Sequence, residues 1–398
     1  MAVTETTTES WGSRLGSSLK GVLVGGAMFI AGFPVLFWNE GNSVKTARAI
    51  DEGEGACISV ESNEMVDPEM NGKLVHMTGR ADTSDVLSDS TFGVSAKAIC
   101  LERKVEMFQW MEESRTSEKK KLGGSVEKTT TYTYKQEWVD YAVDSSRFNT
   151  AQGHENPGSM EFQSEKWLAE NVTFGAFRLN KKQIERIGAA QAFAFPTNFT
   201  CALPRVKVQG TTIYVPNGET RGNALNNRDV VSQTRIGDMR VTFRVIYPHD
   251  ISVIAKQQGD TFVDYTAKNG KKLSYLHDGI DDAAAMFASA RSGNAIITWL
   301  VRLGGFLLMF FGLSGVFKPL SVLADVLPIL GDIVEIGTGF VAGLLALVCA
   351  LVTIAVAWLF YRPILGVLLL AAASFLVWKL IQRRKAAKAA KAASGTVA

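Results

Sequence analysis

Four stretches of the chain are almost purely apolar, and each has about the length that a helix needs to cross a bilayer. They cover residues 19–38, 295–317, 336–360 and 363–381. About 20 apolar residues suffice, because a helix rises about 1.5 Å per residue and the hydrocarbon layer is about 30 Å thick. The pattern predicts a membrane protein with one N-terminal and three C-terminal transmembrane helices.

The long segment between the first and second spans, residues 39–294, is polar enough to be soluble. Several of its runs alternate apolar with polar side chains and are rich in Val, Thr and Tyr, which is typical of strands. We predict strands at residues 105–111, 129–143, 205–215, 240–247, 251–255 and 272–276. The fold class is therefore α+β: four transmembrane helices and a large β-rich domain outside the cytoplasm.

Three local patterns complete this domain. Residues 179–187 predict a short helix with a capping box, in which Asn180 caps the first turn and Gln183 bonds back. Residues 281–290 predict a helix that leads into the second span. Residues 112–128 are polar and contain two glycines, and they predict a mobile hairpin loop with a solvated run at Lys119–Lys121. Contact of this run with acidic lipid headgroups is the alternative.

The segment between the second and third spans, residues 318–335, carries its charges on one helical face. These polar positions are Lys318, Ser321, Asp325 and Asp332, with Glu335 nearby. The pattern predicts an amphipathic helix in the membrane interface. The alternative is that the acids enter the bilayer and line a proton or cation path, since intramembrane carboxylates are usually functional. Arg302, inside the second span, can snorkel or pair with one of these acids.

Lysines and arginines close to the spans predict the orientation. Arg14 and Lys20 precede the first span, and a basic tail at 382–398 follows the last. Because such residues favour the cytoplasmic side, both termini are expected there, and residues 39–294 are expected in the periplasm or an organelle lumen. Residues 1–18 are expected to be disordered. Within the first span, Gly21 and Gly25 form a small-xxx-small motif that predicts close helix packing.

Composition and motifs narrow the chemistry. A net charge of +3 gives no reason to expect a nucleic-acid partner, and four cysteines are too few for a disulfide framework. No nucleophile elbow, phosphate loop or zinc-protease motif occurs, and the four histidines are scattered. We therefore expect no catalytic residues, cofactor or metal. A membrane-anchored enzyme remains an alternative only if His249, Asp250 and neighbouring acids share a cleft.

Three strings and the span layout together resemble one known family. The strings are WNEGNSVKTARAIDEG (38–53), NGKLVHMTG (71–79) and LERKVEMFQW (101–110), and the layout is one span, a large domain and three spans. In these features the chain resembles the LUMA family (transmembrane protein 43 family). The family signature comprises Trp38, Asn39, Glu40, Gly41, Val44, Lys45 and Thr46. The Lys/Ala-rich tail departs from the family and favours a bacterial or otherwise divergent member.

The resemblance implies a non-enzymatic multipass scaffold that self-associates and assembles membrane protein complexes. In eukaryotes it implies the endoplasmic reticulum and inner nuclear membrane, with emerin and lamins as partners. A bacterial relative would instead occupy the inner membrane, with a periplasmic domain and no such partners. Membrane lipid, further copies of the chain and other membrane proteins are the expected partners. The first alternative function is an oligomeric ion channel or transporter component that uses the acids of residues 318–335. The second alternative is a membrane-anchored enzyme whose domain lies outside the cytoplasm.

Overall fold

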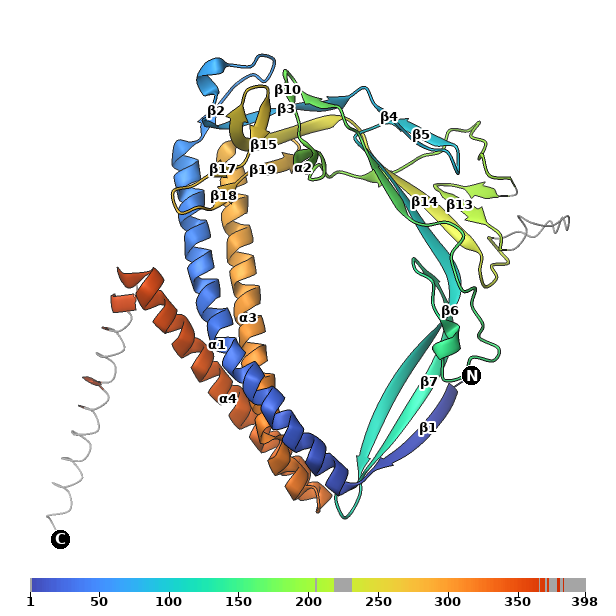
Figure 1. Cartoon of the computed structure of the whole chain (residues 1–398), viewed down its shortest axis with the longest axis vertical. Coiled ribbons are helices and arrows are strands. Elements are labelled where there is room, and N and C mark those ends of the chain that lie inside the picture. Colours follow the sequence, from blue (N-terminus) through green and yellow to red (C-terminus); the bar gives the residue numbers. More distant parts are fainter. Residues whose placement is uncertain are drawn as a thin grey trace, which may run out of the picture. The chain divides into compact units, whose positions relative to one another are not determined.

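The chain folds into two compact units, which we call the β unit and the helical unit. The computed structural model describes residues 2–204, 206–217, 231–364, 366–368, 371, 378–379 and 382. The β unit comprises Met1–Thr7, Ala49–Glu118 and Lys128–Ala290, and the helical unit comprises Thr8–Arg48, Lys119–Glu127 and Arg291–Ala398. Figure 1 labels the helices and strands of both units.

Three long helices form most of the helical unit: α1 (Trp11–Ala56), α3 (Ala283–Ala324) and α4 (Pro328–Tyr361). The last residues of α1, from Ala49, and the first residues of α3, up to Ala290, belong to the β unit. Each contains a window that is long and apolar enough to cross a membrane. The first three predicted spans therefore correspond to three candidate membrane helices. The fourth predicted span, residues 363–381, falls largely outside the residues that the structure describes.

The segment predicted as a separate interfacial helix has a different structure. Helix α3 continues through residue 324, and α4 starts at Pro328, so that residues 318–335 form the end of one helix, a short turn and the start of the next. In this turn the amide of Leu327 bonds to the carbonyl of Ala324. Proline suits the first helical position because it has no amide hydrogen to leave unpaired there.

The N-terminus is also ordered, in contrast to the predicted disorder of residues 1–18. Strand β1 (Ala2–Glu9) pairs with strand β7, and α1 starts at Trp11. The repeated threonines of AVTETTTE suit an edge strand, since β-branched side chains favour extended backbone. Composition alone indicated disorder here because no local pattern shows that a pairing strand exists far along the chain.

Glycines bring α1 and α3 into backbone contact. A Cβ atom placed on Gly25 would lie 2.5 Å from the carbonyl oxygen of Gly312, and one placed on Gly312 would lie 2.6 Å from the amide nitrogen of Phe29. Gly21 contributes less, since only its carbonyl oxygen lies near Gly315. The predicted small-residue face thus lies against a matching glycine face on α3, which the sequence analysis did not single out.

A closed barrel forms the centre of the β unit. Its strands are β3 (Leu74–Thr83), β9 (Val172–Phe174), β10 (Phe177–Arg178), β16 (Thr261–Val263) and β15 (His249–Gln258). Each pairs with the next and β15 returns to β3, with β10–β16 as the one parallel pair in this ring. This strand order is that of an OB-fold barrel. Strands β2 (Ile58–Ser59) and β19 (Tyr275–Asp278) extend the sheet.

Large apolar side chains from all five strands fill the barrel. Phe174, Phe177 and Phe262 are fully buried inside it, together with Val253 of β15. Helix α2 (Lys181–Ile184) adds Ile184 to this core and has the predicted capping box, with Asn180 and Gln183 bonding reciprocally. The helix is shorter than the predicted 179–187, and the predicted capping box at its first turn is confirmed.

A second sheet has its own core. The strands in order are β1, β7 (Val126–Val139), β6 (Cys100–Lys120), β14 (Met239–Ile246), β13 (Thr212–Val215) and β12 (Lys207–Gln209). Strand β8 (Glu165–Leu168) pairs with β6, and strand β11 (Gln191–Ala192) pairs with β14. Two hairpins are separate from both sheets: β4 (Val86–Asp89) with β5 (Val94–Lys97), and β17 (Tyr265–Thr266) with β18 (Lys272–Leu273). Phe92, Leu101 and Phe243 lie at the centre of this core.

The predicted loop at residues 112–128 is wrong. Strands β6 and β7 run through most of it as a long hairpin, and the turn lies only at residues 121–125. Gly123 and Gly124 adopt φ values of +88° and +80° there, a region that side chains with a Cβ disfavour. The polar composition of the hairpin suggested a loop because neither face of this part is fully covered by a core.

Candidate functional site

The acid of the family signature is buried between the long helices of the helical unit. Glu40 of α1 is almost completely buried and forms a bidentate ion pair with Arg302 of α3, at 2.6 Å and 2.8 Å. The indole N–H of Trp358 on α4 donates to the same carboxylate at 2.7 Å. One side chain of the signature therefore joins all three long helices.

Neighbouring polar groups extend this contact along the α1–α3 interface. The side-chain amide of Asn39 donates to the carbonyl of Thr298 at 3.1 Å. The Thr298 hydroxyl lies 2.8 Å from that of Ser43, and the Asn294 side chain donates to the Ser43 carbonyl. We call these residues the Glu40 cluster: Asn39, Glu40, Ser43, Asn294, Thr298, Arg302 and Trp358.

Aromatic rings cover the charged pair. The Arg302 guanidinium lies 4.7 Å from the centre of the Trp299 ring and 5.8 Å from that of Trp358. Such cation–π contacts, together with bidentate geometry, favour arginine over lysine at this position. A buried pair of this kind specifies which helix faces meet, and loss of one partner would leave an unpaired charge in an apolar surrounding.

The other signature residues have mixed surroundings. A Cβ on Gly41 would lie 2.5 Å from the Tyr361 ring, so a glycine permits this contact with the end of α4. Val44 is buried, Thr46 is half-buried, and Trp38 and Lys45 are exposed. Some signature residues therefore form a packing and hydrogen-bonding face of α1, and the others point outward.

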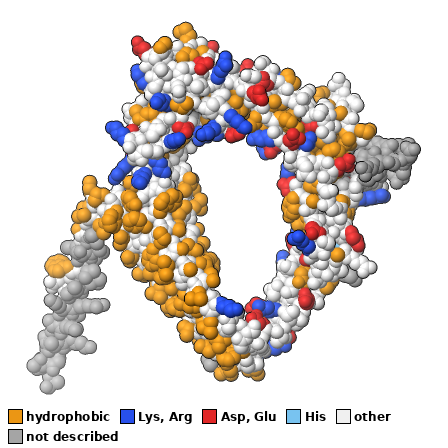
Figure 2. Space-filling model, viewed as in Figure 1, with side chains coloured by type: hydrophobic (Ala, Val, Ile, Leu, Met, Phe, Trp, Pro, Cys, Tyr) orange, Lys and Arg blue, Asp and Glu red, His pale blue; other side chains and the backbone are white. Residues whose placement is uncertain are grey.

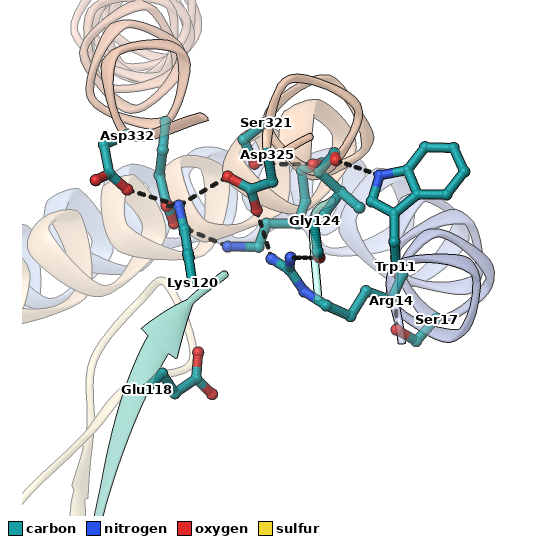
Figure 3. Close-up of polar contacts among 12 residues, drawn as sticks. Trp11, Arg14, Ser17, Glu118, Lys120, Gly124, Ser321, Asp325 and Asp332 are labelled. Carbon is teal, nitrogen blue, oxygen red and sulfur yellow. Dashed lines mark hydrogen bonds and ion pairs between the residues drawn. The ribbon is translucent and has the colours of Figure 1, made fainter. Parts of the chain in front are cut away.

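A second group of charges lies at the turn between α3 and α4 (Figure 3). Asp325 is 1% exposed, and its carboxylate contacts Arg14 of α1 at 2.5 Å and Lys120 of the β6–β7 hairpin tip at 2.9 Å. Arg14 precedes the predicted first span, and Lys120 belongs to the run that was predicted to be solvated. Three segments that are far apart in sequence therefore meet around one buried carboxylate.

Lys120 is the centre of this group. Its ammonium contacts Asp332 and Glu335 at 2.8 Å each, and Lys318 contacts Glu335 at the same distance. Burial disfavours the charged form of Lys120, but hydrogen bonds to Asp332, Glu335 and Asp325 outweigh it and hold the pKa of the ammonium above its ordinary value. Lys120 stays protonated at any physiological pH.

Backbone contacts dock the hairpin tip on the helices. The amide of Gly123 donates to the carbonyl of Val326, and Arg14 donates to the carbonyl of Gly124. The Trp11 indole N–H donates to the carbonyl of Val322 at 2.8 Å. We call this assembly the clasp: Trp11 and Arg14, the hairpin tip Lys119–Glu127, and residues 318–335.

The clasp and the Glu40 cluster change two sequence-based interpretations. Arg302 pairs with Glu40 and not with an acid of residues 318–335. The clasp also conflicts with the expected orientation: if residues 295–317 cross the bilayer once, residues 39–294 and 318–335 lie on opposite sides, and Lys120 could not contact Asp325. The complementary charges of Lys119–Lys121 and the three acids were the signal that could have predicted this contact.

The histidines of the β unit are held by structural partners. His249 lies 2.9 Å from Asp278, and His277 lies 2.8 Å from Asp281. His76 lies 2.9 Å from the carbonyl of Asp281, and His154 stacks on Tyr134. In the part of the chain that the structure describes, no group of three or more His, Cys, Asp or Glu residues is arranged to hold a metal ion.

Comparisons with known proteins agree with the signature. The family model described as Transmembrane protein 43 matches residues 107–363. The chain belongs to the transmembrane protein 43 family. It is 34% identical to Transmembrane protein 43 of Mus musculus over 366 residues, which cover 89% of this chain and 88% of that protein.

Two further relatives extend the comparison. The human Transmembrane protein 43 is 33% identical over 366 residues, with 89% of this chain and 88% of the relative covered. The Transmembrane protein 43 homolog of Drosophila melanogaster is 29% identical over 363 residues, with coverages of 89% and 93%. No solved structure matches the chain significantly. The resemblance inferred from the signature strings is therefore confirmed.

Proposed function

We propose that this membrane protein is a non-enzymatic scaffold that self-associates in the bilayer and holds other membrane proteins together. The observation that carries the proposal is the outward face of α4. This helix packs inward through the small residues Ala342, Ala346, Ala350 and Ala357, which are buried. Its large apolar side chains, such as Phe340, point outward.

This arrangement reverses the usual distribution of large and small side chains. In a soluble helix, large apolar residues cover the core, and an exposed apolar face of this length is a contact surface. Leu344, Val348 and Leu351 lie on the outward face of α4, and Figure 2 shows hydrophobic side chains over the helical unit. Lipid and further copies of the chain, or other membrane helices, are the partners that fit such a face.

Fixed ion pairs support a structural role for the buried charges. Among the described residues of the helical unit, the two almost fully buried carboxylates, Glu40 and Asp325, both contact arginine or lysine. A carboxylate that carries protons or cations needs access to water and freedom to change partners. These contacts favour a rigid bundle over the channel alternative.

Self-association is tested by the mass of the protein in nanodiscs. We expect an oligomer for the wild type and a smaller assembly for the double variant Leu344→Ala, Leu351→Ala on α4. The control Leu23→Ala, Ile30→Ala removes two outward residues at the same spacing from α1. A wild type that stays monomeric over a range of protein-to-lipid ratios would contradict the proposal.

Ion flux into proteoliposomes tests the channel alternative. Asp332 and Glu335 are the clasp acids with the greatest exposure, so Asp332→Asn with Glu335→Gln removes the charges most able to meet water and leaves Asp325 paired. We expect no proton or cation flux in either protein. Ion flux in the wild type that disappears in this variant would contradict the scaffold proposal and support a pore.

A further inference from the structure

Three tryptophans, one from each long helix, lie around the Glu40–Arg302 pair. Trp358 of α4 donates to Glu40, and the Trp299 ring of α3 lies 4.7 Å from the Arg302 guanidinium. Trp38 of α1 comes just before Glu40 in the same helix. Trp38 and Trp299 are 64% and 67% exposed. Because tryptophan is enriched where helices leave the hydrocarbon layer, the three rings mark the depth of one membrane interface.

Basic residues predominate in the three helix segments at this interface. Residues 39–48, 291–302 and 355–364, all of which the structure describes, contain five lysines and arginines and a single acid, Glu40. Glu40 is buried and paired with Arg302. The other four basic residues are Lys45, Arg48, Arg291 and Arg362. These segments therefore carry a net positive charge next to the membrane surface.

One face of α1 brings two of these basic residues to the end of α4. A Cβ on Gly41 would lie 2.5 Å from the Tyr361 ring, and the Arg48 guanidinium donates to the Tyr361 carbonyl at 3.0 Å. Lys45 lies four residues after Gly41 and three before Arg48, so it shares this face of the helix. Arg362 directly follows Tyr361. The three basic residues therefore come together where α4 ends.

The side chains of this basic group turn back toward the membrane. In an α-helix each Cα–Cβ bond tilts toward the N-terminus, which for Lys45 and Arg48 is the direction of Trp38. The Arg362 guanidinium lies 5.9 Å from the centre of the Trp358 ring, so it too turns toward the interface. Lys45 and Arg48 are exposed. Long basic side chains commonly extend in this way to reach the headgroup layer.

An apolar track runs along α4 from this basic group. Val352, Val356 and Phe360 follow one another at intervals of four residues, and all three are exposed. Phe37 of α1 packs against Phe360 with ring centres 5.7 Å apart, so the track borders α1. A phospholipid with a negative headgroup has the matching arrangement, since its phosphate suits the basic group and its acyl chains suit the apolar track.

We propose that Lys45, Arg48 and Arg362 bind the phosphate of an anionic phospholipid, whose acyl chains lie along the outward face of α4. The lipid belongs to the leaflet that adjoins Trp38. A guanidinium has several N–H groups, and the contact of Arg48 with Tyr361 uses one of them, so others can donate to phosphate oxygens. Anionic headgroups attract basic residues beside a span. The bound lipid thereby joins α1 to α4 at the membrane surface.

Native mass spectrometry of the detergent-solubilised protein tests lipid binding. Phosphatidylglycerol and phosphatidylcholine with the same acyl chains are titrated, and we expect several-fold more bound phosphatidylglycerol on the wild type. The variant Lys45→Gln, Arg362→Gln should lose most of this preference, and it keeps the Arg48 contact with α4. The control Lys20→Gln, Arg147→Gln removes two exposed basic residues elsewhere and should keep the preference. Equal losses in both variants would show attraction by net charge alone and overturn the site.

The thermal midpoint of the wild type provides a readout without any variant. A ligand that binds only the folded protein raises the midpoint, so phosphatidylglycerol should raise it more than phosphatidylcholine in the same detergent. Glycerol 3-phosphate has the phosphate without acyl chains and should leave the midpoint unchanged. An equal rise with this compound would show a site for free anions and overturn the lipid assignment. Equal midpoints with the two phospholipids would show that the headgroup charge is not recognised.

Photoreactive lipids locate the bound molecule on the wild type, even if the variant fails to fold. Phosphatidylglycerol with a diazirine on its acyl chain should label residues 352–360 several-fold more than the matching phosphatidylcholine probe. Equal labelling by the two probes would reject a specific site. Absence of labelling with both probes would show that protein, such as a second copy of the chain, covers the apolar track, and it would also overturn the proposal.

Discussion

Glu40 and Arg302 are 262 positions apart in the chain and meet as a buried bidentate ion pair. The pair joins the acid of the family signature to the only arginine within the predicted second span. Trp358 donates to the same carboxylate, so the contact also fixes α4. The signature thus has a direct physical reason: it specifies how three helices pack.

Removal of one partner of this pair should destabilise the protein strongly. Arg302→Met leaves the Glu40 carboxylate without its cation in an apolar surrounding, and such losses cost about 3–5 kcal/mol. Glu40→Leu should be similarly costly because it leaves the guanidinium unpaired. The measurement is the free energy of unfolding, or the thermal midpoint, in the same detergent or nanodisc.

The double variant Glu40→Leu, Arg302→Met separates charge loss from a general packing defect. We expect it to recover part of the stability, since neither unpaired charge remains. The control is Asp144→Asn in the exposed pair with Arg147, for which about 0–1 kcal/mol is expected. Additive losses in the double variant would show that the two charges do not depend on each other.

Two adjacent glycines of α1 should respond oppositely to the same substitution. In Gly25→Ala the new methyl group would lie 2.5 Å from the backbone oxygen of Gly312, and no flexible side chain can move to relieve the clash. In Gly26→Ala nothing lies within 4 Å, and alanine favours a helix by about 1 kcal/mol over glycine. We expect a lower thermal midpoint for Gly25→Ala and an equal or higher one for Gly26→Ala. Equal losses in both variants would contradict the close α1–α3 contact.

The sequence predicts best what depends on local pattern. Hydropathy identifies the three helices because the length of an apolar run is a property of neighbouring residues. The capping box at Asn180 and Gln183 is correct for the same reason: both partners lie within one turn. Strand alternation at 240–247 is likewise visible in one segment and corresponds to β14.

Contacts between distant segments were not predictable in this way. The sequence indicated Asp325, Asp332 and Glu335 as candidate partners for Arg302, and only the packing of α1 against α3 shows that the partner is Glu40. Lys120 reads as solvated because its neighbours are polar, yet it meets three acids more than 200 positions away. The α3–α4 turn reads as an amphipathic helix because its helical period continues across a break at 325–327.

The clasp should protect the hairpin tip from trypsin. Asp325→Asn weakens the contacts of both Arg14 and Lys120, and the backbone at Lys119–Lys121 should then be cut several-fold faster in nanodiscs. Asp332→Asn is the matched control: it also removes a carboxylate from Lys120, but one that is 62% exposed and therefore worth little. Cleavage at wild-type rate in Asp325→Asn would mean that the tip does not depend on this carboxylate. The cut sites are read by mass spectrometry of the fragments.

Cys57, just beyond the end of α1 at Ala56, should react more slowly than an exposed cysteine at pH 8. Burial disfavours its thiolate and raises the pKa from the ordinary value of 9.0 to about 11, which lowers the thiolate fraction at pH 8 about 100-fold. A thiolate of higher pKa is also a better nucleophile, and this raises its intrinsic reactivity roughly tenfold. The alkylation rate of Cys57 at pH 8 should therefore be about tenfold lower than that of an exposed cysteine.

The pH dependence follows from the sign of the shift. A group with a raised pKa stays neutral to higher pH, so the alkylation rate of Cys57 should still rise about tenfold per pH unit between pH 9 and 10. An engineered exposed cysteine at Ser117→Cys should approach its plateau in this range. Alkylation is followed by iodoacetamide labelling and peptide mass spectrometry on one sample, so that both cysteines report under identical conditions. A plateau of the Cys57 rate below pH 9.5 would show that its thiol is not buried against the cluster that includes Phe287 and Leu273.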